Sequence, residues 1–458
     1  MPDAVPVPES TIASWQRRIF ALLWVSYASY YLCRMNFAAA QPEILHEFPT
    51  WTKADVGLIP SVYSVFYAVG QFVNGQLGSR FGARRMMVTG LVLISGANLL
   101  FSWTSSYPLM LLLWAINGYC QAIGWPLVVQ TMSNWFRVGR RGTMMGLIST
   151  CYQGGNVLAW LLAGYLTSEF NWRAAFWVPG LTLLPVALLL ALGLRNRPED
   201  AGLPHLRDDL SFPPSEADTS KTAVGGARGG GTAPTERGDG GAAAATAPAH
   251  DDWTILRIVK VTLSSKVLWI LALSYFCFNA VRYAFMNWGI QYFNDFHGVT
   301  IKGSAFLSIA FPLIGSLGAI SSGWASDRFF NGRRAPVCTV MLGVLALLCV
   351  AFTPVSPGDV LSATVILGAA GFMIYGPDAI LTGAAAIDLA HPKAAASATG
   401  FIMAMGNLGA SIVSGFGVGK VLDRSGGNWT PVFYTLAILS VVSAATAALL
   451  WNARPKGK

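Results

Sequence analysis

The sequence is short of charged residues. Only 12% of its 458 residues are Asp, Glu, Lys or Arg, whereas a soluble globular chain carries about 25%. A surface cannot be solvated at half that density unless much of it faces lipid, so the composition excludes a soluble enzyme and a disordered protein. Acidic residues are the scarcer kind, at 22 against 31 basic residues, which leaves a net charge of +9.

Cysteine and histidine are scarce as well. The six cysteines lie within apolar stretches and the five histidines lie outside them, and neither set has the spacing of metal ligands or of a disulfide scaffold. The Gly-rich segment 225–231 lacks the strand, Lys and helix of a phosphate-binding loop. We find no nucleophile–base pair either, and therefore expect no metal, no cofactor and no enzymatic activity.

Long apolar runs are what the sequence has in abundance, since 53% of its residues are hydrophobic. A membrane-spanning helix needs about 20 mostly apolar residues. Twelve segments satisfy this requirement: residues 18–40, 56–78, 86–104, 108–133, 142–168, 173–195, 265–293, 303–326, 336–354, 359–388, 395–421 and 430–453. The sequence thus predicts an all-α membrane protein with twelve transmembrane helices.

The twelve segments form two groups of six on either side of residues 196–252. Gly and Ala make up 17 of the 30 residues in 221–250, which is too little apolar bulk to offset the entropy of ordering. We therefore expect the following division: a cytoplasmic segment 1–17, a six-helix bundle 18–195, a flexible cytoplasmic linker 196–252, a second six-helix bundle 253–453 and a cytoplasmic tail 454–458.

Basic residues are spread unevenly over the short connections. With the N-terminus placed in the cytoplasm, 15 Lys and Arg fall on the inner side and 5 on the outer side, as the positive-inside rule requires. We therefore predict a multi-pass protein of the cell (inner) membrane with both termini in the cytoplasm. The positive net charge follows from this topology and indicates no nucleic-acid partner.

Two loops and two buried arginines reveal an internal repeat. The loop 78–85 resembles the loop 323–334, and Arg80 precedes Arg328 by 248 residues. Arg34 and Arg282, the basic residues deep within spans, are also 248 residues apart. The halves are therefore expected to be pseudo-symmetric, with a substrate site between them near the bilayer midplane. The loop residues either pair across a cytoplasmic gate or bind lipid headgroups: Arg80, Arg84, Asp327 and Arg328.

Arg34 and Arg282 are the strongest candidates for a binding site. A charge at the bilayer centre costs upward of ~3 kcal/mol, so such a residue normally faces a cavity and has a task. Both continue polar stripes along one helix face, formed by Tyr27 with Tyr31 and by Tyr275 with Asn279. A third stripe contains Tyr63, Tyr67, Gln71 and Asn74.

The chemistry of two guanidinium groups indicates an anionic ligand. Each offers forked donors that match phosphate or carboxylate oxygens, and two that face one point match a dianion. Asp378 lies near the middle of the tenth span, after Tyr375-Gly376-Pro377. It is a counter-ion for the empty arginine site or a proton carrier.

The stretch Tyr30-Tyr31-Leu32-Cys33-Arg34-Met35-Asn36-Phe37 resembles the first-span motif of the organophosphate:phosphate antiporter family, within the major facilitator superfamily. Further matches are Gln121-Ala122-Ile123-Gly124-Trp125-Pro126, Asn134-Trp135-Phe136, Arg282-Tyr283, Asn287-Trp288 and Pro392-Lys393-Ala394-Ala395. The resemblance implies the major facilitator fold and a monomer. It also implies the exchange of an organic phosphate for inorganic phosphate by alternating access. The organic phosphate would be glycerol phosphate, phosphoglycerate, a sugar phosphate or a phosphonate.

The same resemblance assigns site residues. Arg34 and Arg282 match the family's phosphate-binding pair, and other pocket positions correspond to Tyr27, Tyr31, Tyr67, Gln121, Trp125 and Tyr375. The sequence departs from the family where it has Met35 and Gln71 in place of lysines and Tyr152 in place of a histidine. We nevertheless expect Tyr152, together with Asn279 of the second stripe, among the substrate-binding residues. Known substrates of the family therefore do not carry over.

Two alternatives from the sequence stay open. The first is a carboxylate or sugar-acid symporter that is coupled to protons through Asp378. The second is a transporter-like receptor that binds a sugar phosphate without moving it. The receptor predicts binding without transport, the symporter predicts transport driven by a pH gradient, and the antiporter predicts transport driven by phosphate exchange.

Overall fold

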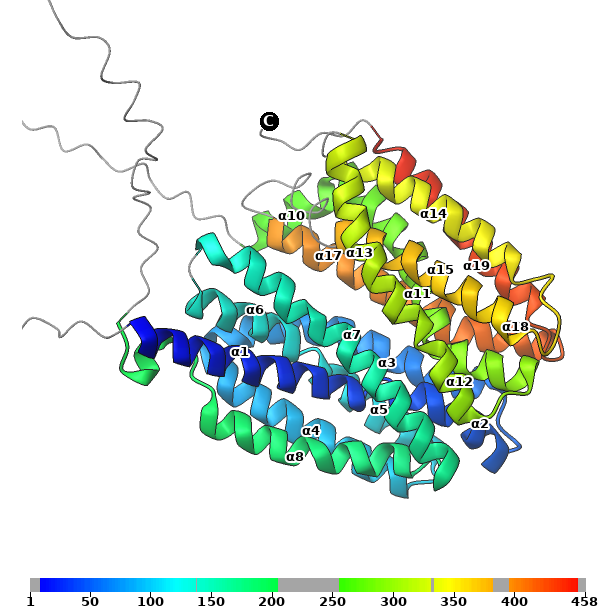
Figure 1. Ribbon diagram of the computed structural model, residues 1–458, viewed down its shortest axis with the longest axis horizontal. Coiled ribbons are helices and arrows are strands. Elements are labelled where there is room, and N and C mark those ends of the chain that lie inside the picture. Colours follow the sequence, from blue (N-terminus) through cyan, green and yellow to red (C-terminus); the bar gives the residue numbers. More distant parts are fainter. Residues whose placement is uncertain (1–8, 137, 205–254, 331–332, 382–394, 452–458) are drawn as a thin grey trace, which may run out of the picture.

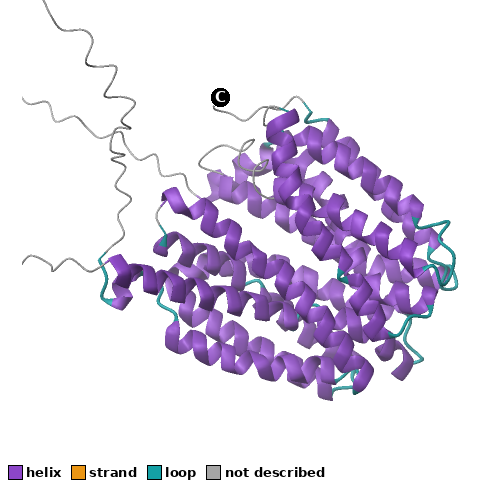
Figure 2. Ribbon diagram, in the orientation of Figure 1, coloured by secondary structure: helices purple, strands orange, loops and turns teal. Residues whose placement is uncertain are grey.

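The computed structural model describes residues 9–136, 138–204, 255–330, 333–381 and 395–451. Within these ranges every regular element is a helix, as Figures 1 and 2 show. The expected all-α architecture is therefore confirmed for the described part of the chain.

The N-terminal half contains eight helices in place of six uninterrupted spans. The first and fourth expected spans are each broken into two, at residues 33–35 and 122–123. The helices are α1 (Glu9–Leu32), α2 (Asn36–Glu47), α3 (Lys53–Phe81), α4 (Ala83–Trp103), α5 (Tyr107–Gln121), α6 (Gly124–Trp135), α7 (Val138–Glu169) and α8 (Ala174–Gly193).

The C-terminal half repeats this plan with a different set of breaks. Its elements are α10 (Ile255–Ser264), α11 (Lys266–His297), α12 (Ile301–Ser308), α13 (Ala310–Phe329), α14 (Arg334–Ala351), α15 (Val360–Ala379), α17 (Ala395–Gly409), the π-helix η4 (Ala410–Gly417), α18 (Val418–Arg424) and α19 (Thr430–Ala448). Capping residues define several ends. Ser265 and Asp359 accept backbone hydrogen bonds at the starts of α11 and α15, and α11 ends at Gly298 with φ 67°, where a residue without Cβ is favoured.

Among the described helices, nine are long and apolar enough to cross a membrane. The other three expected spans correspond to α1 with α2, to α3 and to α7. Each of them packs against the other half: α2 against α11, α3 against η4 and α18, and α7 against α12.

The contacts between the halves include a set at one end of the molecule, where α2, α12 and α18 lie (Figure 1). We call this the far end. Ion pairs cross it between Lys53 and Asp295 at 2.5 Å and between Lys302 and Glu169 at 2.7 Å. The Asp423 carboxylate also accepts hydrogen bonds from the first backbone N–H groups of α3, at 2.9 and 2.8 Å.

Small residues let the halves approach closely at the far end. A Cβ on Gly57 of α3 would lie 2.4 Å from the carbonyl oxygen of Gly415, well inside van der Waals contact. One turn further along α3, Ser61 donates to the carbonyl of Ser411 at 2.6 Å and Ser411 donates back at 2.9 Å. These two positions form a close-packed seam between α3 and η4.

The start of the expected linker packs on the N-terminal half. Asn196 accepts a hydrogen bond from the Arg84 backbone at 2.8 Å, and a short 3-10 helix, η1, follows at Pro198–Ala201. Buried Leu203 lies beyond it. The rest of the expected linker, from residue 205 to 252, lies outside the described residues, as do residues 1–8, the expected tail 454–458 and the side chains of Arg80 and Asp327.

Candidate functional site

The break between α1 and α2 positions Arg34, which lies in the intervening turn. Such a break frees backbone carbonyls, and buried carbonyls require partners. Gln121 donates to the carbonyl of Tyr30 at 2.9 Å and Asn117 donates to that of Cys33 at 2.9 Å. Gln121, expected in the substrate site, is 2% exposed and holds the turn that presents Arg34.

The Arg34 guanidinium lies among tyrosines from both halves. It donates a hydrogen bond to the hydroxyl of Tyr283 in α11. Its central carbon lies 5.5, 5.6, 4.8 and 5.9 Å from the ring centres of Tyr31, Tyr63, Tyr67 and Tyr283. These rings stabilise the charge through cation–π contacts. Its Nε atom is buried and has no hydrogen-bond partner among the described residues.

Arg282 forms an ion pair within the C-terminal half. Its Nη1 lies 2.8 Å from Oδ1 of Asp378, and the side chains are 17% and 20% exposed. The Tyr275 hydroxyl donates to the same oxygen at 3.0 Å. The guanidinium also lies 5.4 Å from the ring centre of Tyr375. This is the geometry of a counter-ion, although a proton carrier at Asp378 would have the same neighbours.

Tyr283 connects the two arginines, and the sequence did not single it out as a site residue. Its hydroxyl binds Arg34, and its ring centre lies 5.7 Å from the guanidinium carbon of Arg282. Successive residues on a helix point about 100° apart, so Tyr283 does not belong to the stripe of Tyr275, Asn279 and Arg282. Its place in the Arg282-Tyr283 motif was the one available signal.

An aromatic cluster adjoins Arg34 on the N-terminal side. Trp125 of α6 lies 4.7 Å from Tyr152 of α7 between ring centres, and Tyr27 of α1 lies 5.4 Å from each. Tyr31 joins the cluster at 6.0 Å from Tyr152 and continues it to Arg34. The structure thus brings together four of the expected pocket residues with the first arginine.

Other expected residues have different surroundings. Gln71 accepts a hydrogen bond from Asn407 across the halves at 3.3 Å, whereas Asn74 donates to the carbonyl of Tyr119 within the N-terminal half at 3.1 Å. Asn279 is buried, and its Oδ1 has no hydrogen-bond partner in the described ranges. Arg328, in the last turn of α13, is exposed.

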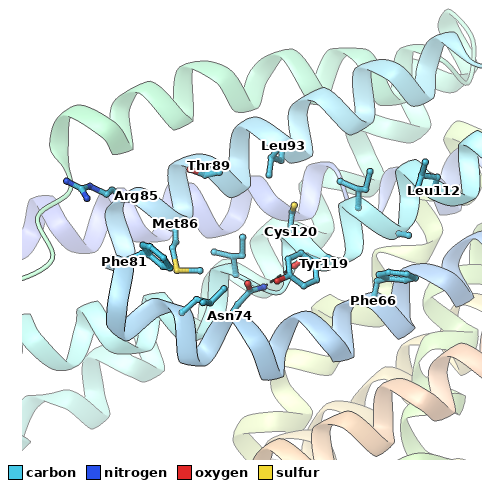
Figure 3. A pocket seen from close by; sticks show the side chains of 14 residues that line it. Phe66, Asn74, Phe81, Arg85, Met86, Thr89, Leu93, Leu112, Tyr119 and Cys120 are labelled. Atoms are coloured by element: carbon cyan, nitrogen blue, oxygen red, sulfur yellow. Dashed lines mark hydrogen bonds between the residues drawn. The ribbon is translucent and has the colours of Figure 1, made fainter.

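Two cavities have different characters. One of about 20 Å³ adjoins Arg34, Met35, Tyr63, Tyr283 and Asn287, which is room for about one water molecule. A larger one of about 560 Å³ lies in a groove of α3, α4 and α5 (Figure 3). Its lining includes the exposed apolar side chains of Phe66, Leu93 and Leu112, with Arg85 at one end. The larger cavity therefore belongs to the outer surface of the bundle.

The formal charge of the site is small. Met35, Gln71 and Tyr152 contribute no cation. In the described part of the chain, the charged groups gathered around Tyr283 are Arg34, Arg282 and Asp378, so their net charge is a single positive unit.

Comparison with known proteins decides the family. Residues 23–414 match the Major Facilitator Superfamily. The chain belongs to this superfamily. It is 30% identical to the membrane sensor protein UhpC of Salmonella typhimurium, over 96% of this chain and 92% of that protein. It is 29% identical to the glycerol-3-phosphate transporter of Bacillus subtilis, over 95% and 92%.

A solved structure supports the same superfamily fold. A bacterial homologue of the human lysosomal transporter Spinster, in an inward-facing and unoccupied conformation, matches with a TM-score of 0.68 at 15% identity, over 95% of each chain. The major facilitator protein described here therefore has the expected fold of two six-helix bundles, and it is a membrane transporter-family protein and not an enzyme. The first-span motif resembles that of the organophosphate:phosphate antiporter family, and the two relatives of this chain named above confirm that resemblance.

Proposed function

We propose that this protein is a secondary active transporter that exchanges an organic phosphate for inorganic phosphate by alternating access. The observation that carries the proposal is the convergence of Arg34 and Arg282, one from each half, on Tyr283. Two forked donors that belong to separate rigid bodies can bind one phosphate between them. The relative named as a glycerol-3-phosphate transporter supports this ligand class.

Substrate binding exchanges partners at the site. Without substrate, Arg34 donates to Tyr283 and Arg282 pairs with Asp378. A phosphate group offers both guanidiniums stronger, charge-assisted hydrogen bonds. The bound phosphate links the two halves because its oxygens accept hydrogen bonds from both arginines. The loaded carrier is then the form that reorients, because the bound phosphate joins Arg34 of one half to Arg282 of the other. Slow reorientation of the empty carrier makes the cycle an obligatory exchange.

The far end is the gate that must open. With both termini in the cytoplasm and the protein in the inner membrane, the far end faces outward, and its closure corresponds to an inward-facing state. Rocking of the two bundles would separate Lys53 from Asp295 and Lys302 from Glu169, together with the seam at Gly57 and Ser61. These contacts lie within one chain, so we expect a monomer to suffice.

Exchange of labelled phosphate tests the proposal. The full-length protein is reconstituted in liposomes loaded with unlabelled phosphate, and uptake of external labelled phosphate is followed without a pH gradient. The substitutions Arg34→Lys and Arg282→Lys each remove a forked donor. Because hydrogen bonds to charged groups contribute about 1.5–3 kcal/mol, we expect either variant to exchange phosphate about 10- to 150-fold more slowly. Arg195→Lys is the matched control, because Arg195 donates to backbone carbonyls outside the site. Undiminished exchange in both site variants would refute the forked-phosphate hypothesis.

The same vesicles test two other functions. A sensor, as the relative UhpC is named, would bind phosphate esters without flux. A carboxylate or sugar-acid symporter coupled through Asp378 would accumulate substrate in response to a pH gradient with no phosphate inside. Phosphate-dependent exchange without a pH gradient is the result that only the antiporter predicts.

A further inference from the structure

We propose that the organic phosphate of this transporter carries an ammonium group, as in an aminoalkyl phosphate or an aminoalkyl phosphonate. This inference rests on the proposed function and names the substrate class of the same site. It is carried by Asp378, whose carboxylate lies against one of the two phosphate-binding guanidiniums, 2.8 Å from Arg282 Nη1.

The charge balance of the site favours such a ligand. The charged groups of the described site are Arg34, Arg282 and Asp378, with one positive unit in excess. A phosphate dianion with an uncharged tail would leave the occupied site with one uncompensated negative unit in a poorly solvated place. An ammonium group on the same molecule makes the occupied site neutral, and buried charges are tolerated when they are paired.

The position of Asp378 suits an ammonium group beside a bound phosphate. Any phosphate held by the Arg282 fork lies on the same guanidinium that contacts Asp378, so the tail of the ligand starts within a few ångströms of the carboxylate. Asp378 is 20% exposed, so protein does not enclose its side chain completely. An ammonium donor on a short alkyl chain can therefore reach the carboxylate while the phosphate holds the arginines.

Aromatic rings complete the place for a cation. Tyr275 donates to the Asp378 carboxylate, and the ring centre of Tyr375 lies 5.4 Å from the guanidinium carbon of Arg282. Tyrosine faces attract a cation through the ring quadrupole, so the carboxylate and these rings together recognise an ammonium group better than a hydroxyl or methyl group.

Competition between isosteric ligands tests the inference. Exchange of labelled phosphate by the reconstituted full-length protein is inhibited with 2-aminoethyl phosphate or with propyl phosphate, which has a methyl group where the first has an ammonium group. 2-Aminoethylphosphonate and propylphosphonate form a second pair. We expect the amine of each pair to inhibit at a concentration at least ten-fold lower. The ligand-induced shift of Tm in detergent gives the same comparison without transport.

Variants of Asp378 assign the effect to the carboxylate. Asp378→Asn is expected to remove the ten-fold preference, and Asp378→Glu is expected to keep most of it. Asp359→Asn is the matched control. It is the same substitution at the start of the same helix, where Asp359 only caps the first turn. Protein stability is checked by Tm, and the wild-type pairs decide the question if the asparagine variant does not fold.

The outcomes separate this inference from the proposed function. Equal inhibition by both members of each pair in the wild-type protein would overturn the ammonium assignment, as would an unchanged preference in Asp378→Asn, and phosphate exchange would stand. Absence of phosphate exchange, with no Tm shift from any of the four ligands, would overturn the proposed function and the inference with it.

Discussion

Closure of the far end depends on the glycine at position 57, and Gly57→Ala is predicted to open it. The added methyl group would lie 2.4 Å from the carbonyl oxygen and 2.9 Å from the carbonyl carbon of Gly415, and 3.1 Å from the Trp288 ring. Backbone cannot yield as a side-chain end can, and overpacking of this kind costs about 1–3 kcal/mol. The cost falls only on the closed state, so we expect the closed-to-open ratio to fall about 5- to 150-fold.

Thiol labelling from outside measures this shift. Ser64→Cys serves as the reporter, since Ser64 is 4% exposed and lies behind the seam beside the small cavity at Arg34. A membrane-impermeant reagent is added to right-side-out vesicles, and the signal from the six native cysteines, all buried, is subtracted. The labelling rate is expected to rise by about the factor given above, since it follows the open population.

The matched control is Gly96→Ala in α4, where an added methyl group meets nothing within 4 Å. Both variants gain the same helix propensity, so a difference between them reports the contact with Gly415. Equal labelling rates in Gly57→Ala, Gly96→Ala and the parent would refute the argument that the seam is the closed gate.

Three further predictions concern the site and its support. Tyr283→Phe leaves Arg34 without its acceptor, so we expect a lower Tm without ligand and a larger Tm increase with phosphate; an unchanged ligand shift would contradict this. Gln121→Ala removes the amide donor to the Tyr30 carbonyl, which keeps only the 3.3 Å bond from the Cys33 backbone, at a cost of about 0.5–1.5 kcal/mol; this should lower Tm while phosphate affinity in the folded protein stays within about two-fold. Hydrogen bonds from Arg173 hold the pKa of Glu47 below its ordinary value of 4.5. The ionised Glu47 carboxylate therefore contributes fully to stability above pH 4.5, and this contribution is lost as the pH falls through the lowered pKa. Glu47→Gln should make Tm less dependent on pH over that acid range.

The sequence by itself was sufficient for the architecture. Lipid excludes charge, so twelve apolar runs with few charged residues indicate membrane helices, and the repeat of 248 residues relates Arg34 to Arg282. A charge in the membrane needs a function, which is why these two residues could be singled out without coordinates.

Hydropathy could not reveal the breaks in the first and fourth spans. Both sides of each break are apolar, and the break at Arg34 is supported by amide donors from α5, far away in the sequence. For the same reason Gln121 was expected at the substrate: its polarity was visible, but the partner of its amide group was not.

What only the tertiary structure decided is which groups the two arginines contact. The partner of Arg34 is Tyr283, 249 residues away, and that of Arg282 is Asp378, on another helix. Helix periodicity orders residues along one face, but the packing of the two halves determines which faces meet. The sequence by itself determined that two buried guanidiniums must be matched by an anion, because an unpaired charge is costly in the membrane. The fold decided that one of them already has a carboxylate beside it, and with it the net charge that a ligand must balance.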